Sequence, residues 1–364
     1  MDKLDFLFIK GDDVLNVRLS KYINCLTELG HKVYFWGWNR SCKPNTNLKV
    51  SECHYLIQGG GFGGKKVAIR YPLWMLKLFL ICLFSGKLKE KQIVAVNFDA
   101  ALPIFFACFI RRVPYIYEIH DEFALSYNFP NWLKSFIRWI DHTIMQNAKL
   151  VIHVDENRVT YKNCNHIIIE NAPDDYWKGA ERSYDTITNT FAVIGNISDV
   201  RGITQIRKFA SEHTYVKILL VGKFYNEKLK ADLLSLPNVE YYNYMPQNKL
   251  FKIMEKCCAI FSLYDPSLEI NRLAASNKVY DAMMMGIPVI TNKEVINSKF
   301  ISDQGIGVVV DYKYNETWNI LADMNFLKDA VKIGTKGRTL YLEEYQFSKM
   351  VATRLIPILS NTDK

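Results

Sequence analysis

Residues 276–290, SNKVYDAMMMGIPVI, join a polar opening to an apolar helical run, a glycine and a β-rich ending. Serine is favoured at the start of a helix and glycine just after its end. The stretch therefore predicts a helix that begins at Ser276, ends at Gly286 and leads into a strand. Successive helical residues point about 100° apart. The three methionines 283–285 thus cannot all face one ligand, and we expect them to pack in a core.

Short β-rich runs alternate with helical patterns on both sides of this stretch. The expected strands are residues 5–11, 31–38, 92–98, 114–120 and 150–154, and then 191–196, 216–222, 239–245, 258–264 and 287–292, with an early helix over residues 17–29. Such alternation indicates parallel sheets covered by helices. We predict two doubly wound α/β domains, residues 1–173 and 191–345, with a linker at residues 174–190 and a helical tail at about residues 346–364.

Composition bounds the class of protein. The chain has 364 residues, of which 49% are hydrophobic, enough for two ordinary cores. Its eight cysteines form no C-x-x-C pair and its beginning does not resemble a secretory signal, so we expect a cytoplasmic protein. The net charge of +9 suits anionic substrates or membranes. Long Lys/Arg runs and nucleic-acid motifs are absent from the sequence, and nucleic acid is not an expected partner.

Residues 71–84, YPLWMLKLFLICLF, are apolar almost all round and have basic flanks. The run is shorter than the ~20 apolar residues that span a bilayer. Two interpretations stay open: a helix buried against the sheet, or an interfacial helix in peripheral contact with the anionic inner face of the cell membrane.

A G-x-G-x-x-G pattern occurs at Gly59, Gly61 and Gly64. In a dinucleotide-binding fold this pattern follows the first strand, with an acid about 20 residues later. Here it follows what looks like a third strand, directly before Gly59 and additional to the strands named above, so a loop that closes over a substrate is favoured over a nucleotide cradle. A dinucleotide-dependent oxidoreductase that modifies sugar nucleotides remains the alternative.

Residues 193–203, VIGNISDVRGI, carry a stronger signal. A strand is expected to end in Gly195, with Arg201 beside a helix start. Backbone N–H groups and a guanidinium together suit a diphosphate. Gly222 and Lys223 repeat the arrangement after the next strand. The alternative is an ordinary turn with a surface arginine.

Residues 262–290 gather polar groups around one helix start. Ser276 can cap the helix, and Lys278 adds positive charge where a phosphate would bind. Asp281 lies one turn further on, on the face shared with Asn277 and Lys278. A carboxylate there can accept two hydrogen bonds from a ribose diol. A capped structural helix is the alternative, but it leaves the charges of Glu269 and its neighbours unexplained.

These motifs, together with residues 93–123, resemble the group 1 glycosyltransferases, which are retaining enzymes of the GT-B fold that use nucleotide sugars. The resemblance implies two Rossmann-like domains facing a cleft. The first would bind the acceptor and the second the donor, and a C-terminal helix would cross back to the first domain.

The resemblance also implies roles for single residues. Arg201 matches a basic residue that binds the donor diphosphate, while Asn196 stands where the family often has an arginine, so Lys278 is the expected replacement. Asp281 matches the second acid of the E-x7-E motif, which holds the donor ribose. Leu273 stands at the first acid, and we expect Glu269 to reach the sugar instead.

The remaining roles follow from the same resemblance. Tyr244 and Met245 match the residues that pack on the base, His120 matches a histidine near the donor sugar and phosphate, and Gly11 matches a loop close to the substrates. The expected catalytic residues are His120, Arg201, Glu269 and Lys278. The expected donor-binding residues are Gly11, Gly195, Asn196, Arg201, Gly222, Lys223, Tyr244, Met245, Ser276, Asn277, Lys278 and Asp281.

The sequence lacks the D-x-D pair with which other glycosyltransferases hold a metal ion. We therefore expect metal-independent, hexosyltransferase-like chemistry without a cofactor, in which fixed cations stabilise the leaving diphosphate. The expected donor is UDP-linked, and the expected acceptor is a glycan or lipid-linked saccharide of surface polysaccharide biosynthesis. A non-catalytic scaffold that binds sugar nucleotides is a further alternative, since Asn196 and Leu273 depart from the family pattern.

Overall fold

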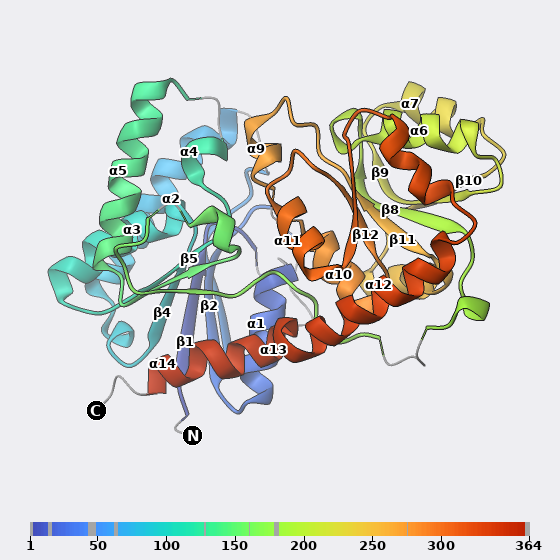
Figure 1. Cartoon of the computed structure of the whole chain (residues 1–364). Helices are drawn as coiled ribbons and strands as arrows, with labels where there is room; N and C mark the ends of the chain where they lie inside the picture. Colours follow the sequence, from blue (N-terminus) through green and yellow to red (C-terminus); the bar gives the residue numbers. More distant parts are fainter. Residues whose placement is uncertain are drawn as a thin grey trace. The chain divides into compact units, whose positions relative to one another are not determined.

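Two parallel sheets organise the chain, each in its own structural unit (Figure 1). The computed structural model describes residues 3–13, 17–42, 49–61, 65–126, 129–159, 161–177, 182–274 and 276–360. The first unit is Met1–Glu170 with Phe347–Lys364, and the second is Asn171–Gln346. The described residues of the expected linker, 174–177 and 182–190, belong to the second unit, where Asp175 pairs with Arg338 at 2.8 Å.

The first sheet has the strand order β3-β2-β1-β4-β5-β6-β7, and every pair is parallel. Its strands are β1 (Asp5–Lys10), β2 (Lys32–Asn39), β3 (Glu52–Gln58), β4 (Gln92–Val96), β5 (Ile116–Ile119), β6 (Leu150–His153) and β7 (His166–Ile168). The strand order reverses between β1 and β4. Ligands of open α/β sheets bind at such a reversal, beyond the carboxyl ends of the strands.

Alternating side chains of these strands pack on two helical layers (Figure 1). Leu7 and Ile9 face the layer of α2 (Lys65–Phe84), α3 (Phe98–Arg111) and α5 (Asn131–Asn147). Phe8 faces the opposite layer, where its ring lies 5.4 Å from Tyr22 of α1 (Val17–Glu28). Tyr22 in turn contacts Phe347, the first residue of α13 (Phe347–Met350), which α14 (Ile356–Ser360) follows. The C-terminal tail is thus part of the first unit.

The second sheet has the order β10-β9-β8-β11-β12-β13, again with parallel pairs, and reverses between β8 and β11. Its strands are β8 (Thr190–Ile197), β9 (Lys217–Phe224), β10 (Val239–Asn243), β11 (Ala259–Ser262), β12 (Val289–Asn292) and β13 (Gly307–Val310). Strand β13 is absent from the predicted set, although three of its four residues are valines, which favour strands. The prediction of two doubly wound α/β domains is confirmed.

Helices cover both faces of the second sheet. They are α6 (Ile203–Glu212), α7 (Glu227–Leu234), α8 (Gln247–Ile253), α9 (Glu269–Arg272), α10 (Asn277–Met285), α11 (Asn297–Gln304) and α12 (Phe326–Leu340). Both units also contain short helical segments. Those of the first unit are α4 (Phe123–Ser126), the 3-10 helices η1 (Gly86–Leu88) and η2 (Glu156–Arg158), and the π-helical η8 (Val351–Leu355). Those of the second unit are the 3-10 helices η3 (Tyr184–Thr186), η4 (Asp199–Arg201), η5 (Met254–Lys256) and η6 (Glu316–Ala322), and the π-helical η7 (Tyr341–Tyr345). On one face the ring of Phe261 lies 5.6 Å from Phe191 and 5.7 Å from Trp318. This aromatic group fixes the centre of the core.

Helix α10 ends as predicted. Gly286 adopts a left-handed conformation, φ 65°, and its N–H bonds back to the helix. The methionines 283–285 are all buried, which confirms their expected place in the core. Gly334 of α12 lies against this turn so closely that a Cβ atom there would sit 2.0 Å from the Gly286 carbonyl oxygen.

Helix α2 has one packed side and one exposed side. Trp74, Leu78 and Cys82 are buried in the core of the first unit. For this side of the helix, the interpretation as a helix buried against the sheet is confirmed. Leu73 and Leu76 are more than half exposed. No helix among the described residues combines the length and the apolar character needed to cross a membrane.

The close approach of α12 to Gly286 predicts opposite effects for two glycines of one helix. Gly334→Ala should lower the free energy of unfolding of the second unit by about 1–3 kcal/mol, because the methyl group meets backbone. Gly337→Ala is the matched control: its Cβ would lie 3.6 Å from Met283. The control should be neutral or stabilising by up to about 1 kcal/mol, since alanine favours helix. Urea unfolding followed by circular dichroism measures both, and equal effects would contradict the close contact.

Candidate functional site

The strand reversal of the second sheet carries a cluster of two cations and a tyrosine. Arg201 ends η4, after β8, and Tyr264 follows β11. The guanidinium carbon of Arg201 lies 4.1 Å from the centre of the Tyr264 ring, and the Lys278 ammonium of α10 lies 5.6 Å from it. The structure thus brings together Arg201 and Lys278, the two cations that the sequence analysis selected, around an aromatic residue that it did not.

The cluster favours negative charge. Burial raises the pKa of Tyr264, but Lys278 and Arg201, together with hydrogen bonds to Ser276 and Ser262, outweigh burial and bring this pKa below the ordinary tyrosine value. The Nη1 atom of Arg201 is buried and has no hydrogen-bond acceptor among the described residues. A buried charged donor costs free energy until an acceptor meets it. An anionic ligand can supply that acceptor.

A buried hydrogen-bond frame holds Tyr264 in place. The side chain of Asn292, at the end of β12, accepts from the Tyr264 amide at 2.9 Å and donates to its carbonyl at 3.2 Å. The amide of Asp265 donates to the Val200 carbonyl at 3.0 Å, which joins the loop after β11 to the loop after β8. The site is therefore built from the ends of three neighbouring strands.

Ser276 occupies the N-cap position of α10, but the expectation that its side chain caps the helix is wrong. The Ser262 hydroxyl donates to the Ser276 hydroxyl at 2.8 Å, and both residues are buried. Ser276 therefore anchors the start of α10 to β11. Asn277 follows on the exposed surface, and Lys278 is half-buried.

The glycine motifs lie inside strands, which corrects their expected placement in turns. Strand β8 continues past Gly195 to Ile197, and β9 continues past Gly222 to Phe224. Gly195 and Gly222 are register partners, and a Cβ atom on Gly222 would lie 1.8 Å from the Gly195 carbonyl oxygen. Close strand approach thus accounts for Gly222. Gly202, with φ 71°, is the residue that turns the chain into α6.

Exposed aromatic residues follow the strand ends beside these glycines. Tyr244 comes directly after β10 and is exposed, with Met245 partly buried behind it. The Tyr225 hydroxyl donates to the Asn196 side chain at 3.2 Å, and the Lys223 ammonium lies 5.1 Å from the Tyr225 ring. These faces are available for stacking against a flat ring.

The acidic residues selected from the sequence lie in different surroundings. Glu269 is exposed at the start of α9, and no described contact joins it to Arg201 or Lys278. Leu273 ends the same short helix. Asp281 is buried. The pKa of Tyr341 is raised mainly by the burial of that tyrosine, and the charge of Asp281 contributes to the rise. The sugar and ribose roles of Glu269 and Asp281 stay predictions.

The first unit carries a second polar cluster at the end of β5. His120 contacts Glu118, with 3.3 Å between Nε2 and Oε1. The buried Arg18 of α1 donates to the same carboxylate at 2.6 Å. Burial raises the pKa of Glu118, but Arg18 and His120 outweigh it and bring this pKa to about 2. Burial also lowers the pKa of His120 in spite of Glu118. The His120 imidazole thus lies against the Glu118 carboxylate in a site where burial disfavours its protonation.

The strand reversal of the first sheet is also occupied by polar groups. Asn97 follows β4 with φ 65°, and its side chain accepts from the His120 amide at 3.0 Å. Gly11 follows β1, and a Cβ atom there would lie 2.0 Å from Asp99 Oδ2. Arg40 donates to the Gly11 carbonyl at 2.7 Å. Burial raises the pKa of Asp99 to about 6, against the influence of Arg40. A side chain at position 11 would therefore displace the Asp99 carboxylate from its present place.

Sequence reasoning missed Tyr264, Glu118 and Asp99. Glu118 had a visible signal, because it is a charged residue in a buried strand, two positions before His120 and on the same face. In the other glycine motif, Gly59 and Gly61 have positive φ after β3, and Gly64 lies outside the described residues. Among the described residues no group of three or more His, Cys, Asp or Glu side chains could hold a metal ion.

Comparison with solved structures identifies the fold. A crystal structure of Anabaena Alr3699/HepE in complex with UDP matches with a TM-score of 0.71 at 14% identity, over 99% of this chain and 100% of that chain. WaaG, a glycosyltransferase involved in lipopolysaccharide biosynthesis, matches with a TM-score of 0.61 at 13% identity, over 97% and 99%. The chain has the GT-B fold. No protein-family profile and no curated protein sequence matches it.

The GT-B fold does not by itself fix the reaction. A UDP-N-acetylglucosamine 2-epimerase also matches, with a TM-score of 0.59 at 10% identity, over 100% of this chain and 98% of the epimerase. The choice between transfer and epimerisation therefore rests on the residues of the site.

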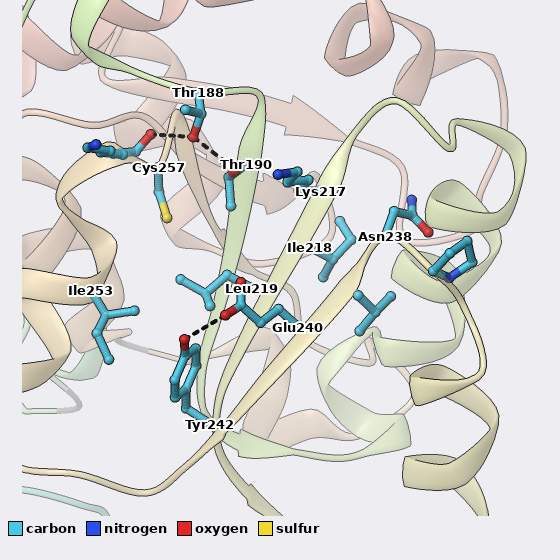
Figure 2. A pocket seen from close by; sticks show the side chains of 13 residues that line it. Thr188, Thr190, Lys217, Ile218, Leu219, Asn238, Glu240, Tyr242, Ile253 and Cys257 are labelled. Carbon is cyan, nitrogen blue, oxygen red and sulfur yellow. Dashed lines mark hydrogen bonds between the residues drawn. The ribbon is translucent and has the colours of Figure 1, made fainter.

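A cavity of about 360 Å³ lies at the opposite end of the strands of the second GT-B sheet (Figure 2). Its lining includes Thr188, Thr190 and Lys217, at the beginnings of β8 and β9. Two pairs of its polar side chains bond to each other: Thr188 with Thr190 at 2.9 Å, and the Tyr242 hydroxyl with Glu240 at 2.5 Å (Figure 2). We assign the functional site to the strand reversal, where Arg201 and Lys278 converge on one ring.

The charge on Glu118 predicts a pH-dependent contribution to stability. Its pKa is about 2 in the folded chain, below the ordinary 4.5, so its stabilisation is present above pH 4.5 and is lost as the pH falls toward 2. Glu118→Gln should lower the free energy of unfolding by about 3 kcal/mol at pH 7, and the difference from wild type should shrink below pH 4.5. Glu122→Gln, which breaks the half-exposed pair with Arg138, is the control and should cost about 0–1 kcal/mol. Urea titrations between pH 7 and 3.5 measure both, and a pH-independent deficit in Glu118→Gln would contradict the ion pair.

Proposed function

We propose that this protein is a retaining glycosyltransferase that moves a sugar from a UDP-sugar to a hydroxyl group of a glycan or lipid-linked saccharide in surface polysaccharide biosynthesis. The observation that carries the proposal is the convergence of Arg201 and Lys278 on Tyr264 at the strand reversal of the second unit. Two cations around a buried ring match the charge of a diphosphate. Similar folds support it, since HepE was crystallised with UDP-glucose and WaaG is a glycosyltransferase of lipopolysaccharide biosynthesis.

The donor is proposed to bind across the carboxyl ends of the second sheet. Arg201 Nη1 hydrogen-bonds the diphosphate and Lys278 adds the second positive charge, which compensates for Asn196. The exposed faces of Tyr244 and Tyr225 receive the base. Asp281 holds the ribose, and Glu269 reaches the sugar hydroxyls.

The proposed reaction breaks the bond between the anomeric carbon of the sugar and the diphosphate oxygen. The acceptor hydroxyl attacks the same face and its proton passes to the departing phosphate, so no protein nucleophile is required. Arg201 and Lys278 stabilise the charge that develops on the leaving oxygen, as prearranged cations do in water-poor sites. His120, whose pKa is lowered by burial, offers a hydrogen bond to the substrate. The proposed chemistry uses neither a metal ion nor a cofactor.

The diphosphate assignment predicts a large effect for one arginine. Arg201→Ala should lower turnover of a UDP-sugar by about 10²–10³-fold, because the leaving group loses its closest charged donor. Arg207→Ala is the matched control: Arg207 lies in α6, pairs with Asp232 on the surface and contacts no part of the cluster. Release of UDP is measured over a panel of UDP-sugars and saccharide acceptors, and circular dichroism verifies the fold of each variant. Near wild-type turnover in a folded Arg201→Ala protein would refute the assignment.

Epimerisation is the second candidate, because a 2-epimerase shares the fold. Incubation with UDP-N-acetylglucosamine without acceptor separates the two reactions. A transferase leaves the configuration at C2 unchanged, whereas an isomerised UDP-sugar in the product mixture would favour the epimerase. Binding of NADH in preference to UDP-sugar would favour the oxidoreductase, and UDP-sugar binding without turnover on any acceptor would favour the scaffold.

Donor choice has its own readout in thermal stability. A ligand that binds only the folded chain raises its melting temperature, by an amount that grows with ligand concentration over Kd. We expect UDP and a UDP-sugar to raise the melting temperature of wild type and of Arg207→Ala, and to raise that of Arg201→Ala much less. Equal shifts in all three proteins would place the diphosphate elsewhere.

A further inference from the structure

Exposed apolar side chains of the first unit gather on three helices. Apart from Val17 and Leu29, every large apolar side chain described as exposed in this unit lies on α2, α3 or α5. They are Ile69, Leu73, Leu76, Leu80 and Phe84 of α2, Phe106, Phe109 and Ile110 of α3, and Trp132, Phe136 and Trp139 of α5. We call these side chains the apolar surface. Several are more than two-thirds exposed, among them Phe84 at 79% and Trp132 at 71%.

The spacing of these residues places them in stripes. On α2 they recur every three or four residues from Ile69 to Phe84, which is one side of a helix. On α5 they recur in the same way from Trp132 to Trp139, and the rings of Phe136 and Trp139 stack at 6.0 Å. The opposite sides of α2, α3 and α5 share one core. The stripes therefore lie on the sides of these helices that face away from the shared core.

The helices that carry the apolar surface expose basic residues and no acidic residue of their own. The only acidic residues of the three helices are Asp99 and Asp141, and both are buried. Their basic residues with described side chains are Arg70, Lys77, Arg111, Lys134 and Arg138, and the exposed Arg112 follows α3. Arg138 pairs with Glu122, which precedes α4. Exposed tryptophan and phenylalanine together with basic residues and no exposed acid complement a negatively charged, apolar partner.

We propose that the apolar surface docks the protein on an anionic lipid bilayer. Its aliphatic and aromatic side chains would enter the boundary between headgroups and acyl chains, where tryptophan is favoured. The basic residues would meet lipid phosphates, whose attraction acts within about one Debye length. A soluble partner protein would need an apolar face lined by acids, whereas a bilayer presents both features over any area. The proposal is independent of the sugar-transfer reaction.

The test uses the full chain and sedimentation with vesicles. Wild type should bind vesicles of phosphatidylcholine with phosphatidylglycerol and should bind pure phosphatidylcholine much more weakly, with binding that falls as salt rises. Phe109→Ser/Trp132→Ser should lower the partition coefficient by about tenfold or more, since two interfacial anchors are lost. Ile320→Ser/Met324→Ser removes two exposed apolar residues of the second unit and is the matched control, which should bind as wild type does.

A charge variant separates headgroup attraction from apolar insertion. Arg112→Gln/Lys134→Gln should lower binding to anionic vesicles several-fold and leave the weak binding to phosphatidylcholine unchanged. All variants are first compared with wild type by circular dichroism and by thermal unfolding. UDP-sugar turnover in solution, measured in parallel, reports on the proposed reaction without vesicles.

Three outcomes would overturn the proposal. They are no vesicle binding by folded wild type, equal binding to both lipid compositions, and equal loss in the Ile320→Ser/Met324→Ser control. A wild-type dimer seen by light scattering and absent in Phe109→Ser/Trp132→Ser, without vesicle binding, would assign the surface to contact between copies of the chain.

Discussion

The stacking of Arg201 on Tyr264 is the contact on which the proposed donor site depends. It requires β8 and β11 to be neighbours, because each residue lies just beyond the end of one of these strands. The same neighbourhood lets Asp265 bond to Val200 and lets Ser262 anchor the start of α10. Lys278 then lies above the same ring. Sheet order thus creates the positive cluster, since residues far apart in sequence meet only at the strand reversal.

The two units treat buried charge differently. In the first unit, Glu118 satisfies Arg18 and contacts His120, and the buried Asp99 lies within the influence of Arg40 and Lys10. In the second unit the cations around Tyr264 have no carboxylate partner among the described contacts, and Arg201 keeps an unused donor. A paired cluster is stable without a ligand, whereas partly buried cations without a carboxylate partner favour an anion. This difference is the physical reason to place the diphosphate on the second unit.

The similar structures share 10–14% of their residues with this chain, and no family profile matches it. A fold survives such divergence because strands and helices need apolar residues at the right period and of fitting volume, not particular side chains. Reactions depend on a few residues placed by the loops. Arg201, Lys278 and Tyr264 therefore carry more of the functional argument than the overall likeness, and the apolar surface of the first unit is a property of this chain's own residues.

The sequence by itself determined the strand–helix rhythm, the two units, the end of α10 at Gly286 and the choice of Arg201 and Lys278, because these depend on local periodicity and residue chemistry. Only the tertiary structure showed that Ser276 bonds to Ser262, that Gly222 is needed for close strand approach, and that Tyr264 and Glu118 lie at the centres of the two polar clusters. Each of these contacts depends on which strands are neighbours, and local sequence patterns do not determine the order of strands in a sheet. The exposed side of α2 was likewise undecided in sequence: the helix is apolar all round, and only its packing with α3 and the sheet selects the side that faces outward.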